Sequence, residues 1–181
     1  AQNKMINAAL LAAELSVSLP NEQRPEKTSG YEGFFHLTRL EATVEEATLH
    51  YIIRDHDRAL FEQKKDLLRT LANRMETKYP GCVTVEVRDQ YYNMREIIEP
   101  GMDVIEYACE AMRAAGVTPR IRPVRGGTDG ARLSFMGLPC PNLFAGGLNF
   151  HGRYEYLPVR SLEKSKETII KLCHIITDQT K

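Results

Sequence analysis

The stretch from residue 125 to 152 holds the groups in this sequence that are best suited to chemistry. It reads RGGTDGARLSFMGLPCPNLFAGGLNFHG, begins with Arg125 and has His151 as its one histidine. An imidazole in a loop can ligate a metal or reach a substrate. A planar guanidinium can hold a carboxylate through two parallel hydrogen bonds. The pattern therefore raises two hypotheses, a metal site and an anion site.

The first part of this stretch, RGGTDG, lies between a predicted strand and a short predicted helix, where free backbone N–H groups can meet an anion. The Walker pattern GxxxxGK[ST] is missing, and the glycines do not follow the GxGxxG spacing. Nucleotide binding is therefore not expected. From the spacing alone, a helix-capping role for Thr128 or Asp129 is favoured over an anion site.

His151 has no second ligand at metal-binding spacing, and such a histidine is more often a polar loop residue than part of a metal site. The four cysteines are widely scattered and never form CxxC, which argues against a structural zinc knuckle or a disulfide scaffold. A reducing, cytoplasmic location is the expectation from this cysteine usage.

Composition narrows the class of protein. The chain has 181 residues, 43% of them apolar and 27% charged, enough for one large or two small domains. Lys plus Arg equals Asp plus Glu at 24 each, so no basic field exists for nucleic acid or for an anionic membrane. No apolar run approaches the ~20 residues that a membrane span needs. Neither nucleic acid nor a membrane is expected as a partner.

Hydrophobic periodicity predicts five elements before the middle of the chain. They are a helix at 3–16, a hairpin of two strands within 31–44 and 47–55, an amphipathic helix at 57–78 and a strand at 83–87. A ferredoxin-type β-α-β sandwich has this order with one more strand in front. The sequence is therefore expected to begin inside an α+β domain.

The second part of the chain has a different character, and the boundary is predicted near residue 95. A helix at 102–115 should end at Gly116, whose missing Cβ suits a left-handed C-cap. A strand at 119–124, a short helix at 131–137 and a last helix at 161–177 follow. This alternation is typical of an α/β segment with too few strands to close a sheet alone.

Four segments together resemble the peptidase T family, the tripeptide aminopeptidases of the dizinc exopeptidase superfamily: YIIRDHD, YYNMRE, the glycine-rich stretch and SLEKSKETIIKL. The resemblance runs over essentially the whole chain. It implies a zinc-bearing α/β catalytic domain interrupted by a ferredoxin-like lid that also supplies the dimer contact. Residues 1–95 then correspond to the lid without its first strand, and residues 96–181 to the C-terminal segment of the catalytic domain.

The same resemblance implies two zinc ions in the intact enzyme, of which this chain supplies one ligand, His151. The other ligands and the glutamate that acts as general base have no match here, so no catalytic residue is present. The chain alone is therefore expected to be inactive and to require the N-terminal catalytic portion of the family. A tripeptide substrate and a homodimer formed through the lid are the other implied partners.

A set of residues around the substrate is also implied. Two arginines match those that hold the carboxylate end of the substrate in the family, and the glycine-rich loop lets backbone pass close to the peptide. The set comprises Arg54, Arg125, Gly126, Gly127, Thr128 and Asp129. Without the resemblance, ordinary surface ion pairing would be the preferred role of the arginines.

Two rival interpretations remain open at the level of sequence. The chain can be a non-enzymatic binding or dimerisation module in which His151 is incidental. It can also be part of a related dizinc carboxypeptidase or deacetylase, which would not require a free amino terminus on its substrate.

Overall fold

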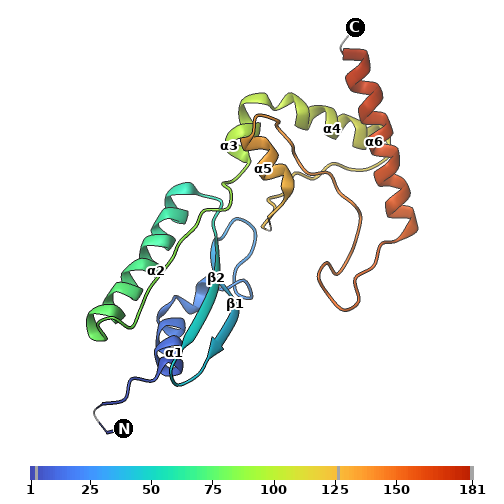
Figure 1. Ribbon diagram of the computed structural model, residues 1–181. Coiled ribbons are helices and arrows are strands. Elements are labelled where there is room, and N and C mark those ends of the chain that lie inside the picture. The colour runs from blue at the N-terminus through green and yellow to red at the C-terminus, as the bar shows by residue number, and fades with distance from the viewer. Residues whose placement is uncertain (3, 126, 180–181) are drawn as a thin grey trace. The chain divides into compact units, whose positions relative to one another are not determined.

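The computed structural model describes residues 1–2, 4–125 and 127–179, which fall into two compact units (Figure 1). Unit 1 is built from the described residues up to Gln90 together with Pro123–Arg125. Unit 2 is built from Tyr91–Arg122 and the described residues beyond 125. The chain therefore passes between the units three times, and each unit is described by itself.

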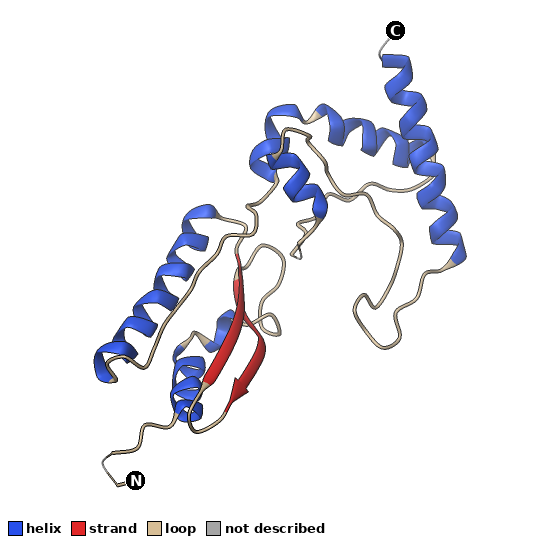
Figure 2. Cartoon of the chain, viewed as in Figure 1, coloured by secondary structure: helices blue, strands red, loops and turns tan. Residues whose placement is uncertain are grey.

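Unit 1 contains an antiparallel hairpin and two longer helices (Figure 2). Its elements are α1 (Ala8–Ser18), η1 (Asn21–Gln23), β1 (Phe34–Ala42), β2 (Ala47–Arg54) and α2 (Arg58–Lys78). The N-terminus of α1 is capped by Asn7, and that of α2 by Asp57, whose side chain accepts from the Leu60 N–H at 2.9 Å. The predicted hairpin and second helix of this half are confirmed, whereas the first helix, predicted at 3–16, begins only at Ala8 and ends at Ser18.

The core of unit 1 forms where α2 and the end of α1 meet the hairpin. Leu19, Phe35 and Leu68 are buried together, and partly buried apolar side chains of β2 and α2 pack against them. The buried residues of α2 recur at helical spacing, so they form one stripe of the helix that is withdrawn from water. This packing fixes the hairpin and the loop that precedes it.

The predicted strand at 83–87 is not formed. The segment is extended, but within the described residues it pairs with no other strand, and a strand is stable only where its backbone groups find ladder partners. Side chains hold it instead. The carboxylate of Glu76 accepts from the N–H groups of Gly81 at 2.5 Å and Val83 at 2.7 Å, and this lowers the pKa of Glu76.

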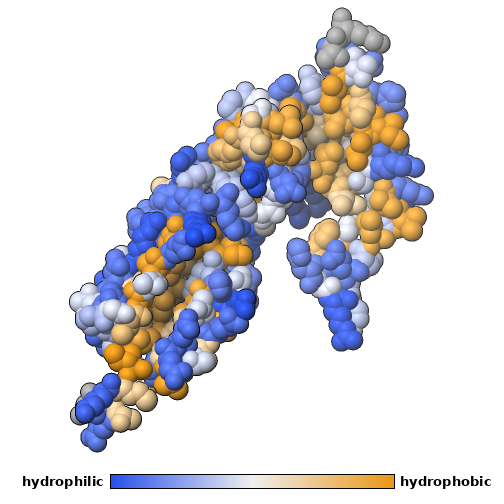
Figure 3. Space-filling model, viewed as in Figure 1, coloured by the Kyte–Doolittle hydropathy of each residue, from blue (hydrophilic) through white to orange (hydrophobic). Residues whose placement is uncertain are grey.

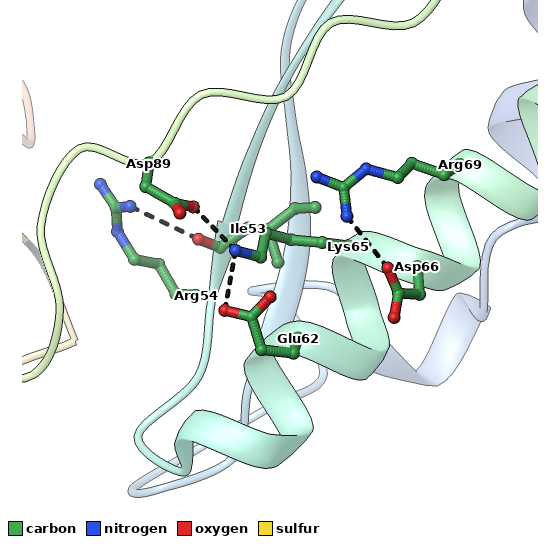
Figure 4. A network of polar contacts seen from close by, with 7 residues as sticks. All are labelled: Ile53, Arg54, Glu62, Lys65, Asp66, Arg69 and Asp89. Carbon is green, nitrogen blue, oxygen red and sulfur yellow. Dashed lines mark hydrogen bonds and ion pairs between the residues drawn. The ribbon is translucent and has the colours of Figure 1, made fainter.

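A buried cation joins the end of this segment to α2 (Figure 4). The side chain of Lys65 is 5% exposed, and its Nζ lies 2.8 Å from Glu62 and 2.9 Å from Asp89. Burial acts to lower the pKa of Lys65, but the hydrogen bonds and charges of the two carboxylates outweigh it and raise the pKa. The charge of Lys65 is therefore fully compensated within unit 1.

Unit 2 is helical over most of its described length. Its elements are α3 (Arg95–Ile98), η2 (Glu99–Gly101), α4 (Asp103–Ala114), α5 (Asp129–Phe135) and α6 (Val159–Gln179). Helix α4 ends as predicted at Gly116, which has φ +72°, and α6 packs against α4. The Nζ of Lys164 on α6 donates to the Ala115 carbonyl at 2.7 Å, so a cation satisfies the end of α4.

The predicted strand at 119–124 is also not formed within the described residues, for the same physical reason as the strand at 83–87. Apolar side chains are exposed along α6, as the orange patches on that helix in Figure 3 show. They include Val159, Leu162, Ile169, Ile170 and Ile176. None of the described helices combines the length and the hydrophobicity that crossing a bilayer requires.

We predict that the acids around Lys65 matter more to stability than Lys65 itself. Asp89→Asn should lower the free energy of unfolding by about 1–2 kcal/mol, because a buried ammonium loses one of its two charged partners. Lys65→Met should change it by less than about 1 kcal/mol, because the substitution removes the buried charge, the side chains of both acids are already partly exposed, and a methionine fills the space. Urea unfolding measures both values.

Asp66→Asn is the matched control, since Asp66 pairs with Arg69 on the same helix but both side chains are exposed. Its effect should stay within about 0.5 kcal/mol. Equal losses for Asp89→Asn and Asp66→Asn would contradict the account of Lys65.

Candidate functional site

The residues predicted to form a site are distributed over both units. Arg54 and Arg125 belong to unit 1, whereas His151 and the loop residues from 127 to 129 belong to unit 2. Gly126 lies outside the described residues. The geometry of each group is therefore given within its own unit.

Arg125 is held in unit 1 by the loop that precedes β1. Its Nη1 donates to the Thr28 carbonyl at 2.6 Å, and its Nη2 donates to the Thr28 hydroxyl at 2.5 Å. The guanidinium lies over the ring of Phe34, with its carbon 4.9 Å from the ring centroid. Its Nε is buried and has no hydrogen-bond partner among the described residues. None of the ion pairs in the described part of the chain includes Arg125.

Arg54, the last residue of β2, makes polar contacts at the end of unit 1 (Figure 4). Its Nη2 donates to the side-chain oxygen of Gln90 at 3.0 Å, and its Nη1 to the Ile53 carbonyl at 3.4 Å. Both acceptors are neutral oxygens. The two arginines of the predicted set are thus anchored by different segments of the same unit.

His56 lies close to Arg125 and was not singled out from the sequence. Its ring packs edge-on against Tyr31, with the centroids 5.1 Å apart. Burial lowers the pKa of His56, and the charge of Arg125 lowers it further, while Asp55 opposes both. Asp55 itself is engaged by Lys64 at 2.8 Å, and both side chains are nearly inaccessible. His56 is consequently biased toward its neutral form.

In unit 2, glycines 127 and 130 lie tightly against a side chain and a backbone carbonyl of the protein itself. A Cβ added at Gly127 would overlap the hydroxyl of Tyr91, and one at Gly130 would lie 2.5 Å from the Cys140 carbonyl oxygen. Thr128 occupies the N-cap position of α5 but makes no side-chain capping bond. Its hydroxyl instead accepts from the Asn142 side chain at 3.2 Å, and Asp129 is the first helical residue.

His151 lies in an exposed loop closed by a bridge between Leu148 and Tyr156. Its backbone is left-handed at φ 62°, as is that of Asn149 at φ 56°, which is uncommon for residues with a side chain. The carboxylate of Glu155 accepts from the His151 backbone N–H at 3.0 Å and stabilises the turn. Over residues 1–2, 4–125 and 127–179, no three histidine, cysteine or acidic side chains are grouped to hold a metal.

The arrangement can therefore do two things chemically. It presents one accessible imidazole on a constrained loop, which fits one ligand of a metal site and not a complete one. It also holds a guanidinium, that of Arg125, with unused donors and no acidic partner among the described residues. Thr28, Phe34 and His56 are the contributors that the sequence did not reveal. Only the DHD triplet after Arg54 drew attention to this region.

Comparison with known proteins gives consistent matches. Residues 1–82 match the model of a peptidase dimerisation domain. The chain is 66% identical over 175 residues to a peptidase T of Parabacteroides distasonis and 51% identical over 176 residues to one of Caldanaerobacter subterraneus. Each match covers 97% of this chain and 43% of the relative. The chain thus spans less than half the length of these curated relatives.

Solved structures confirm the fold class. A tripeptidase from Staphylococcus aureus superposes with a TM-score of 0.70 at 17% identity, over 94% of this chain and 46% of that one. An aminopeptidase from Bacillus cereus superposes with a TM-score of 0.61 at 22% identity, over 92% of this chain and 44% of that one. The chain therefore shares its α+β fold with the aligned parts of these two proteins.

We predict that Gly130→Ala destabilises the loop at the start of α5. The added methyl would meet the Cys140 backbone, which the Ser134 hydroxyl holds at 3.0 Å, so the free energy of unfolding should fall by about 1–3 kcal/mol. Gly101→Ala is the control, because its Cβ would meet only the Asp103 side chain at an ordinary 3.5 Å. Denaturant unfolding of both variants measures the difference, and equal stability would contradict the close packing at Gly130.

A second prediction concerns pH. Because the folded state lowers the pKa of His56 below its ordinary 6.5, the unfolded chain binds this proton at higher pH than the folded chain. The contribution of His56 to the free energy of unfolding is complete above pH 6.5 and is lost as the pH falls through the pKa of His56 in the folded state. His56→Gln should flatten the decline of unfolding free energy below pH 6.5, measured from pH 8 to 5, whereas exposed His174→Gln should leave it unchanged. The same slope in wild type and His56→Gln would contradict the assignment.

Proposed function

Because this chain is similar to peptidase T along 97% of its length, we propose that it is part of a zinc-dependent aminotripeptidase. The whole protein would release the N-terminal residue from tripeptides. The observation that carries this proposal is the 66% identity to a peptidase T, which spans both units and not only the dimerisation domain. A related carboxypeptidase or deacetylase is the alternative within the same class of enzyme.

The two halves of the chain would serve different purposes. Residues 1–95 would form the lid and the contact between two protomers, a role supported by the dimerisation-domain match over residues 1–82. Residues 96–181 would form the C-terminal segment of the catalytic domain. A homodimer is accordingly the expected assembly of the whole protein.

His151 would supply one ligand to the zinc centre. Its exposed position on a constrained loop fits that role, whereas the rest of the ligand set and the general base would come from the remainder of the protein. Zinc would supply an activated water and polarise the scissile carbonyl. Since one imidazole cannot supply a three- or four-ligand site, residues 1–181 by themselves are expected to be inactive.

The arginines would bind the other end of the substrate. A tripeptide has a free carboxylate a fixed distance from its first peptide bond, so a guanidinium that holds this carboxylate selects peptides by length. Arg125 suits the role because it has unused donors and no acidic partner among the described residues. Arg54 would assist it, and Gly126, Gly127, Thr128 and Asp129 would line the path of the peptide backbone.

We predict that His151→Ala in the zinc-loaded whole protein lowers kcat/KM for trialanine by at least about 100-fold, because loss of a metal ligand disrupts the activated water. Chelation should abolish activity, and zinc should restore it in wild type only. The exposed His174→Ala is the matched control and should retain wild-type kinetics. Release of free alanine, measured by amino acid analysis, reports the reaction.

The choice of substrate separates the alternatives. An aminotripeptidase should not cleave N-acetyl-trialanine, whose blocked amino end a carboxypeptidase would accept. Rapid cleavage of the acetylated peptide would favour the carboxypeptidase reading. Undiminished activity of His151→Ala would refute the role of this histidine.

A further inference from the structure

Arg125 is anchored in a way that uses only part of its hydrogen-bonding capacity. A guanidinium carries five N–H donors. Two of them donate to Thr28, while the buried Nε–H finds no acceptor among the described residues. A buried donor left unpaired costs free energy, and so does a cation withdrawn from water without a counter-charge. A bound anion would accept from the unpaired Nε–H and would balance the charge of the guanidinium.

Thr28 determines which side of the guanidinium remains available. Its hydroxyl donates its only proton to the Arg24 carbonyl at 2.9 Å, so a lone pair of the oxygen faces the Nη2 of Arg125. The backbone carbonyl of the same residue takes Nη1. Both terminal nitrogens are therefore held by one residue, and the edge that Nε shares with Nη2 keeps two unused N–H groups.

Phe34 restricts the guanidinium of Arg125 from one face of its plane. Its buried ring lies against one face of the group, which prevents the plane from tilting toward β1. Residues Thr28, Phe34 and Arg125 all belong to unit 1, so this arrangement does not depend on the placement of unit 2. The neighbouring His56 is biased toward its neutral form and supplies no counter-charge to Arg125.

We propose that Thr28 is a positioning residue, which holds Arg125 by its terminal nitrogens so that the Nε–Nη2 edge receives the C-terminal carboxylate of a short peptide. The two N–H groups of that edge match the two oxygens of a carboxylate. This inference rests on the proposed function, in which Arg125 binds the substrate, and it adds the residue that orients it. A purely structural clamp would fasten residues 123–125 to unit 1 without favouring any ligand.

The test uses the metal-free whole protein and two probes, trialanine and trialanine amide, which differ in the terminal carboxylate. Calorimetric titration gives the ratio of their affinities. Wild type should bind the acid more tightly than the amide. Thr28→Val, which keeps the shape but removes the hydroxyl, should reduce this ratio about tenfold, the effect of losing a hydrogen bond to a charged group. Thr28→Ser should restore the ratio to within about twofold.

Thr77→Val is the matched control, because the Thr77 hydroxyl bonds only within α2 at an exposed position of the same unit. Thermal unfolding of each variant shows whether it is folded. If Thr28→Val does not fold, Phe34→Leu takes its place and should lower the same ratio, since it uncovers one face of the guanidinium.

Two results would overturn the inference: a wild type that does not prefer the acid, or an acid-to-amide ratio that Thr28→Val leaves unchanged. The outcome is separable from that of the proposed function, because no metal and no hydrolysis are involved. If the protein hydrolyses trialanine but Thr28→Val leaves the acid-to-amide affinity ratio unchanged, the proposed function stands and the positioning role of Thr28 is refuted. If the predicted affinity ratios are found but no tripeptide is hydrolysed, only the proposed function is refuted.

Discussion

The contact between Arg125 and Thr28 is the constraint on which the candidate site depends. It joins residues 97 positions apart and brings Pro123–Arg125 into unit 1, directly before the glycine-rich loop begins. Because the contact uses a hydroxyl, a carbonyl and an aromatic ring in place of a carboxylate, it orients the guanidinium without neutralising it.

A comparison with Lys65 shows why this matters. Both residues are cations in the same unit, Lys65 buried and Arg125 half-buried, but Lys65 has two carboxylates within 2.9 Å and Arg125 has none among the described residues. The compensated charge of Lys65 serves the fold, since it ties the segment ending at Asp89 to α2. The uncompensated charge of Arg125 remains available to a ligand.

Local patterns in the sequence predicted the parts of the fold that local forces determine. The hairpin, the longer helices and the end of α4 at Gly116 follow from hydrophobic spacing and from a residue without Cβ. The strands at 83–87 and 119–124 were wrong because alternation shows which residues suit a strand, not whether a neighbouring strand exists to pair with them. The tertiary structure determines whether these two segments have a strand to pair with.

The same limit applies to the site. His151 and the arginines were identifiable by resemblance, but Thr28 and Phe34 became visible only once the fold placed them against Arg125. No spacing rule connects such distant positions. The most direct test of the account is a crystal structure of the whole protein with zinc and an uncleaved tripeptide analogue. The terminal carboxylate should lie on Nε and Nη2 of Arg125, with Thr28 still bound to the same guanidinium. A carboxylate held elsewhere, with Arg125 paired to an acidic side chain from the rest of the protein, would contradict it.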